Sequence, residues 1–143
     1  MKKILTFLLS VLLFFVFSDN VYAIIDPTGV LNNRVGIHIF SEKDLEDAGK
    51  LVNSGGGDWG YVTFVMTERE RDHDRWRQVF DQMRRLHLSP IVRIATKAVG
   101  STWEAPYEAE INNWIAFLNS LNCVIENRYI IIANEPNHAY EWG

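Results

Sequence analysis

The stretch WGYVTFVM, residues 59–66, decides the fold class. It is eight residues long, almost continuously apolar, and rich in β-branched and aromatic residues, which is typical of a β-strand covered on both faces. A helix is predicted after it, because apolar residues then recur at the i, i+3, i+4, i+7 spacing of one helical face. Those residues are Trp76, Val79, Phe80, Met83 and Leu86.

The same strand and helix pattern precedes this stretch. RVGIHIF, residues 34–40, predicts a strand, and the run from Ser41 to Asp44 resembles a capping box at the start of a helix. The glycines at 55–57 are expected to end that helix. Its apolar stripe is Leu45, Ala48, Leu51 and Val52.

The pattern also continues after it. PIVRIA at 90–95 and YIIIA at 129–133 predict a third and a fourth strand, and Pro106 opens a helix between them. The apolar stripe of this helix is Ile111, Trp114, Ile115, Leu118 and Leu121. Alternating strands and amphipathic helices predict an α/β fold built from parallel βαβ units. Periodicity alone leaves both a doubly wound sheet and a barrel open, but no glycine-rich phosphate loop follows the first strand.

The N-terminus has the pattern of a secretory signal peptide. Lys2 and Lys3 precede an apolar stretch at 4–17 that is too short for a membrane span, and a possible cleavage site follows Ala23. A retained anchor or a buried helix is the alternative. We expect residues 1–23 to be removed, 24–33 to be a linker and 34–143 to be the folded domain. The protein is then secreted or extracytoplasmic, without membrane association after cleavage.

Charge and cysteine content exclude several classes of partner. Removing residues 1–23 takes away two lysines and one aspartate, so the formal net charge of −4 becomes −5. There is no basic patch, so nucleic acid is not an expected partner, whereas a neutral carbohydrate is compatible. Cys123 is the only cysteine, so no internal disulfide can form. No cofactor is expected, and no residues have the spacing of metal ligands.

The fourth predicted strand ends in Asn134-Glu135-Pro136-Asn137. Reactive residues of parallel α/β folds lie at the carboxyl ends of strands. An apolar fourth strand ending in Asn-Glu-Pro resembles the clan A glycoside hydrolases, which are retaining (β/α)8-barrel enzymes, over about residues 34–143. The resemblance implies that Glu135 is the general acid/base and that Asn134 bonds the sugar 2-hydroxyl. The alternative is that Asn-Glu-Pro is ordinary turn chemistry.

Alternation within the strands predicts which residues accompany Glu135. If Glu135 faces a barrel interior, then Gly36-His38-Phe40, Tyr61-Thr63-Val65 and Ile91-Arg93-Ala95 do so as well, and the aliphatic residues between them face the helices. Arg93 in an apolar strand is expected to have a carboxylate partner. Arg93 either orients the nucleophile or binds the substrate, or it forms a structural ion pair. His38 is a candidate substrate ligand or a core histidine.

Aromatic residues follow the predicted strand ends. Trp103 and Trp142 are candidate sugar platforms, because an indole face suits the apolar face of a pyranose; loop packing is the alternative. The charged run at 67–75 is expected to be a solvated loop and helix start, because its alternating signs neutralise one another.

In clan A the nucleophile is a second glutamate after a seventh strand, and four strands do not supply one. About 120 residues remain after cleavage, fewer than the roughly 200 of a whole barrel. We therefore expect an N-terminal half barrel that is inactive alone and self-associates through open sheet edges. The alternatives are a noncatalytic carbohydrate-binding or surface protein and an α/β interaction domain.

Overall fold

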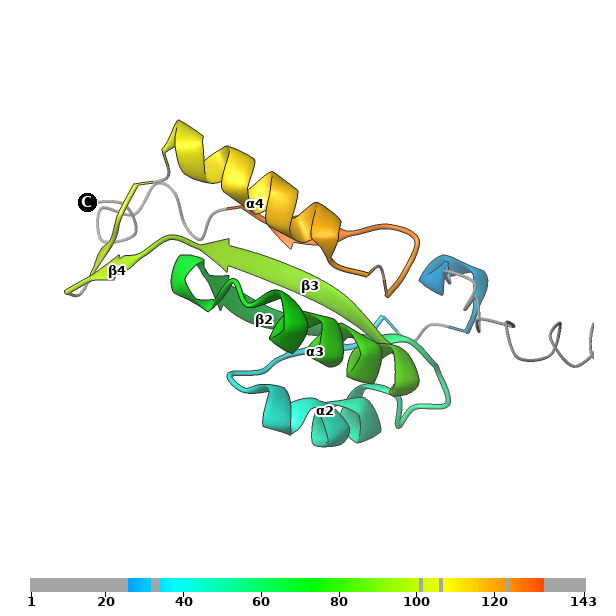
Figure 1. Ribbon diagram of the computed structural model, residues 1–143. Helices are drawn as coiled ribbons and strands as arrows, with labels where there is room; N and C mark the ends of the chain where they lie inside the picture. The colour runs from blue at the N-terminus through cyan, green and yellow to red at the C-terminus, as the bar shows by residue number, and fades with distance from the viewer. Residues whose placement is uncertain (1–25, 32–33, 101, 106, 123, 133–143) are drawn as a thin grey trace, which may run out of the picture.

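The computed structural model describes residues 26–31, 34–100, 102–105, 107–122 and 124–132. Four strands form a parallel sheet in the order β1-β2-β3-β6 (Figure 1). Their bounds are Gly36–His38 for β1, Gly60–Thr67 for β2, Leu88–Ala95 for β3 and Tyr129–Ile131 for β6. The predicted α/β class with parallel strands is confirmed.

Three α-helices connect the strands: α2 (Leu45–Val52), α3 (His73–Arg85) and α4 (Glu108–Ser120). Figure 1 shows α3 running along β3. Single 3-10 turns lie at Pro27–Gly29, Glu42–Asp44 and Glu68–Glu70, and a short antiparallel hairpin joins β4 (Ala98–Val99) to β5 (Thr102–Trp103). No described helix is both long and apolar enough to cross a membrane.

The sheet has two unlike faces, as the alternation of side chains predicts. Along β2, each residue that packs under the helices is buried and each residue between them is half-buried. We call these the covered face and the open face. The covered face includes Ile39, Val62, Phe64, Met66 and Val92, and the open face includes His38, Tyr61, Thr63, Val65, Ile91 and Arg93. The open face is half-buried or exposed from β1 to β6, apart from Ser89 at its amino end.

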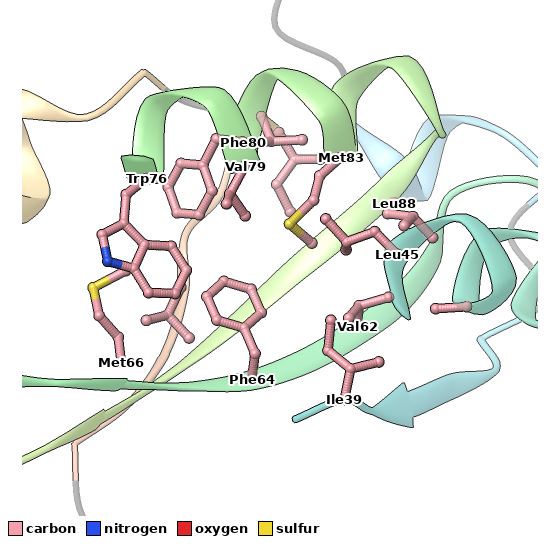
Figure 2. Packing of buried hydrophobic residues seen from close by; sticks show 14 of the residues in the cluster. Ile39, Leu45, Val62, Phe64, Met66, Trp76, Val79, Phe80, Met83 and Leu88 are labelled. Atoms are coloured by element: carbon pink, nitrogen blue, oxygen red, sulfur yellow. The ribbon is translucent and has the colours of Figure 1, made fainter. Parts of the chain in front are cut away.

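An aromatic cluster fixes α3 on the covered face (Figure 2). The Phe64 and Trp76 rings stack with their centroids 5.2 Å apart, and Phe80 meets Phe64 edge to face at 6.3 Å. The predicted stripe of α3 is confirmed, since Trp76, Val79, Phe80 and Met83 are all buried and Leu86 packs against the same core. Burial of these large side chains is the main source of stability in a domain of this size.

Several predicted strand bounds were wrong because the backbone turns left-handed just before the strands. Arg34, Trp59 and His87 have φ values of +55°, +56° and +53°. The first strand therefore starts at Gly36 and not at Arg34, and β2 starts at Gly60 and not at Trp59. The third strand extends back to Leu88, so Pro90 lies inside it. On the side of β3 that faces β6, pairing begins only at Ile91, so Pro90 has no strand partner there.

The helical stripes on either side of α3 were predicted only in part. Leu51 in α2 and Ile111 and Ile115 in α4 are more than half exposed, whereas the prediction placed them in the core. The capping run from Ser41 begins a 3-10 turn, and α2 follows from Leu45. Val35, expected on the covered face, is also exposed. These edge helices and strands have fewer described neighbours than α3 and β2.

The two leucines of α2 test the assignment of its buried face. Leu45 is fully buried and Leu51 is 57% exposed, so Leu45→Ala should lower the free energy of unfolding by about 2 to 5 kcal/mol. Leu51→Ala is the matched control and should change it by less than about 1 kcal/mol. Urea unfolding followed by tryptophan fluorescence measures both. Equal losses for the two variants would contradict this assignment of the buried face of α2.

Candidate functional site

The carboxyl ends of the strands lie at one end of the sheet, because all four strands are parallel. Strand β6 ends at Ile131, and the Asn-Glu-Pro segment follows two residues later in the sequence. Glu135, Asn134 and Trp142, the predicted acid/base and two predicted sugar ligands, lie outside the described residues. The remaining candidates are His38, Arg93 and Trp103.

His38 is the last residue of β1 and lies exposed on the open face. Its ring stacks on that of Phe40 with a centroid distance of 5.3 Å and an interplanar angle of 20°. Phe40 is 98% exposed, which is unusual for an apolar ring of this size. In this structure the stacked pair is exposed, so His38 is accessible to a ligand.

Arg93 lies on the open face in the middle of the sheet. The register places it between Val65 of β2 and Ile131 of β6, which are both apolar. Its Nε is buried and has no hydrogen-bond partner among the residues that the structure describes. A buried guanidinium nitrogen without an acceptor is costly, so this position suits an anionic or hydrogen-bond-accepting group that comes from outside the described residues.

His38 and Arg93 share a face but do not meet. In the register His38 is level with Thr63 and Ile91, and Arg93 is two residues further along β3. Two strand spacings separate them, which corresponds to about 10 Å across the sheet. The two side chains therefore suit different parts of one extended ligand. As predicted, His38, Thr63 and Arg93 share one face of the sheet, but His38 and Arg93 lie two strands apart.

Trp103 lies in a hairpin that sequence analysis did not predict. The hairpin extends beyond the carboxyl end of β3 (Figure 1), and Trp103 pairs there with Ala98. Lys97 and Glu104 close its base with an ion pair of 3.0 Å. Trp103 is half-buried, so one part of the indole remains accessible. Gly100 has a φ of +61° in this turn. The glycine itself was the feature of the sequence that could have predicted the turn.

The segment at 67–75 is more ordered than the expected solvated loop. Thr67 and Glu70 form a complete capping box, which the spacing T-x-x-E would have revealed. Arg71 pairs with Glu110 of α4 at 2.6 Å, and its guanidinium lies 5.0 Å from the centroid of the Trp114 ring. This pairing ties the loop after β2 to the start of α4. Arg71 and Glu110 are far apart in the chain, so no local sequence pattern predicts their pairing.

Glu110 is held in its charged form. Its pKa is lowered from the ordinary value mainly by the side-chain hydrogen bond from Asn113, and further by Arg71 and Tyr107, against the opposing effect of burial. Among the described residues, no group of three or more His, Cys, Asp or Glu side chains is arranged to hold a metal ion.

Comparisons of this chain with protein-family models, with curated proteins and with solved structures found no match.

The Glu110 network predicts a specific dependence of stability on pH. A carboxyl whose pKa is lowered by folding stabilises the fold above its ordinary pKa of 4.5, and this contribution disappears as the pH falls through the folded-state pKa. Glu110→Gln should therefore flatten the decrease in unfolding free energy below about pH 4.5. Glu108→Gln, at an exposed position in the same helix, is the control and should leave the slope unchanged. An unaltered slope for Glu110→Gln would contradict the network.

Proposed function

We propose that this chain is the N-terminal half of a (β/α)8 barrel and carries the acid/base of a retaining glycoside hydrolase. One observation supports the barrel over a doubly wound sheet. The strands are neighbours in chain order, without the reversal that creates a switch point in a doubly wound sheet. The α-helices pack into one core on the covered face and leave the open face available as a barrel interior.

The proposed chemistry follows from the position of Asn-Glu-Pro after β6. Hydrolysis of a glycosidic bond with retention needs one carboxyl that protonates the leaving oxygen and a second that attacks the anomeric carbon. Glu135 is proposed as the first. Desolvation and a neighbouring carboxylate raise the pKa of such a group and keep it protonated until the proton is transferred. Asn134 is proposed to bond the sugar 2-hydroxyl more strongly in the transition state than in the ground state.

Arg93 supports a second carboxylate on the same face. Its buried, unpartnered Nε lies on the open face, which is the face that the barrel proposal turns toward the axis. A carboxylate from polypeptide outside residues 1–143 would satisfy this donor and be oriented by it. We therefore propose Arg93 as a positioning residue for the nucleophile, and we propose that residues 1–143 alone do not hydrolyse glycosides.

The location of the protein is also a proposal. The basic and apolar N-terminal segment supports export, and the absence of an internal disulfide leaves the fold dependent on its hydrophobic core. The substrate is proposed to be an extracytoplasmic oligosaccharide or polysaccharide, since the open face offers aromatic and uncharged polar groups along with one arginine.

The acid/base role is tested by Glu135→Gln in the complete protein. Loss of the proton donor should reduce kcat/KM by several orders of magnitude, roughly 10²- to 10⁴-fold, for substrates with poor leaving groups. Aryl glycosides with activated leaving groups need less protonation and should lose less. Steady-state kinetics with both substrate types measure the difference.

Equal losses for the two substrate types would contradict the assignment of Glu135 as acid/base. Glycan binding by the complete protein without any hydrolysis would instead support a noncatalytic carbohydrate-binding protein on the same fold.

A further inference from the structure

A pocket outside the open face lies between the segment after β1 and the segment after β2. Its volume is about 140 Å³. A volume of this size suits a single small ligand unit and not a chain of several units. Apolar side chains of the core, among them Ile39, Phe64 and Trp76, form its floor. We call it the loop pocket.

Charged side chains hold one another in place at the rim of the loop pocket. Arg75 Nη2 lies 3.1 Å from Glu42 Oε2, and Arg75 Nη1 lies 3.6 Å from Glu70 Oε1. The guanidinium also lies 5.2 Å from the centroid of the Trp76 ring. Glu70 is fixed further by a hydrogen bond from the Thr67 hydroxyl at 2.8 Å. These groups are therefore preorganised, which reduces the entropic cost of binding a ligand.

The rim groups remain accessible although they are paired. The side chains of Arg75, Glu42 and Glu70 are each about two-fifths exposed. The pKa of Glu42 is lowered, first by its own backbone N–H and then by Arg75, so it is a charged acceptor at neutral pH. A carboxylate beside a guanidinium offers acceptors and donors together, which matches the vicinal hydroxyl groups of a sugar.

Phe40 forms an exposed wall of the same pocket. It is among the residues that line the pocket, it is 98% exposed, and its ring stacks on the imidazole of His38. A free aromatic face of this kind, next to fixed polar groups, suits a ligand with one apolar and one polar side. A pyranose ring has both.

The charges of the rim favour a neutral ligand. Two carboxylates and one guanidinium leave a net charge of −1, which disfavours phosphate or sulfate groups. The guanidinium occupies the space between the carboxylates, which disfavours a divalent cation. A neutral ligand rich in hydroxyl groups avoids both costs.

We propose that the loop pocket is a sugar-binding subsite that holds one neutral monosaccharide unit, with its apolar face on Phe40 and its hydroxyl groups on Glu42 and Arg75. The choice of a sugar as ligand rests on the proposed function. The subsite lies beside the open face at the carboxyl ends of β1 and β2, so it binds a unit of the substrate away from the scissile bond.

Binding is measured on the complete protein carrying Glu135→Gln, which keeps the subsite and removes the proposed proton donor. The probes are the methyl glycosides of glucose, galactose, mannose and xylose at concentrations up to tens of millimolar. Saturation-transfer NMR detects binding, and the titration gives Kd. At least one methyl glycoside should bind, and Phe40→Ala should raise its Kd by at least fivefold.

Two further variants separate binding from folding. Glu42→Gln keeps the shape of the rim but removes one charged acceptor, and it should also weaken binding. Ile115→Ala changes an exposed apolar residue on α4, away from the loop pocket, and should leave Kd unchanged. Circular dichroism should show that all three variants fold.

The outcomes distinguish this proposal from the proposed function. Failure of all four glycosides to bind, or binding that neither Phe40→Ala nor Glu42→Gln weakens, would overturn the subsite even if Glu135-dependent hydrolysis is found. Binding that depends on Phe40, in a protein without hydrolytic activity before the Glu135 substitution, would support the subsite and overturn the catalytic proposal.

Discussion

The packing of α3 on β2 and β3 is the constraint on which the rest of the structure depends. Phe64 projects from the covered face of β2 and is enclosed by Trp76 and Phe80 of α3 (Figure 2). Because side chains alternate along a strand, burial of Phe64 on one face forces its neighbours Thr63 and Val65 onto the other. The parallel register then carries this choice to β1 and β3 and directs His38 and Arg93 to the open face.

The two ends of the sheet differ in their construction. At the amino end, Trp59 and His87 stack with their ring centroids 4.9 Å apart, and Asp58 lies 2.9 Å from the His87 ring nitrogen. The side chain of Asn53 accepts a hydrogen bond from Gly60 and donates to the carbonyl of His87. These contacts hold two bulky residues in left-handed conformations. The carboxyl end instead carries the long connection from β3 to α4 and the exposed ring of Phe40, which fits the usual division between a stabilising end and a functional end.

The features predicted from sequence were those that local periodicity determines. The alternation of β2 and the stripe of α3 have strong apolar patterns and became the centre of the core. Leu51 and Ile115 have equally apolar side chains at helical spacing, yet they are exposed, because spacing does not show how much neighbouring structure a helix has. The left-handed Trp59 was not predictable, since intrinsic preference disfavours that conformation for a bulky side chain.

The residues of the candidate site also divide into those that a local sequence pattern predicts and those that depend on contacts between distant segments. Sequence alone indicated that Arg93 needs a partner, because an arginine in an apolar strand is unusual, and its Nε is unpartnered among the described residues. The link from Arg71 to Glu110 and the loop pocket around Arg75 depend on contacts between distant segments, which no local pattern encodes. Phe40 was predicted to face the interior with His38, but its nearly complete exposure required the structure.

The central proposal is that the chain carries the acid/base of a retaining glycosidase. The stereochemistry of the first product tests it most directly, because a double displacement preserves the anomeric configuration and a single displacement by water inverts it. ¹H NMR of the complete protein acting on a glycan of known linkage resolves the anomeric protons before mutarotation. The account predicts that the first sugar released has the configuration of the substrate. Initial release of the opposite anomer would contradict it.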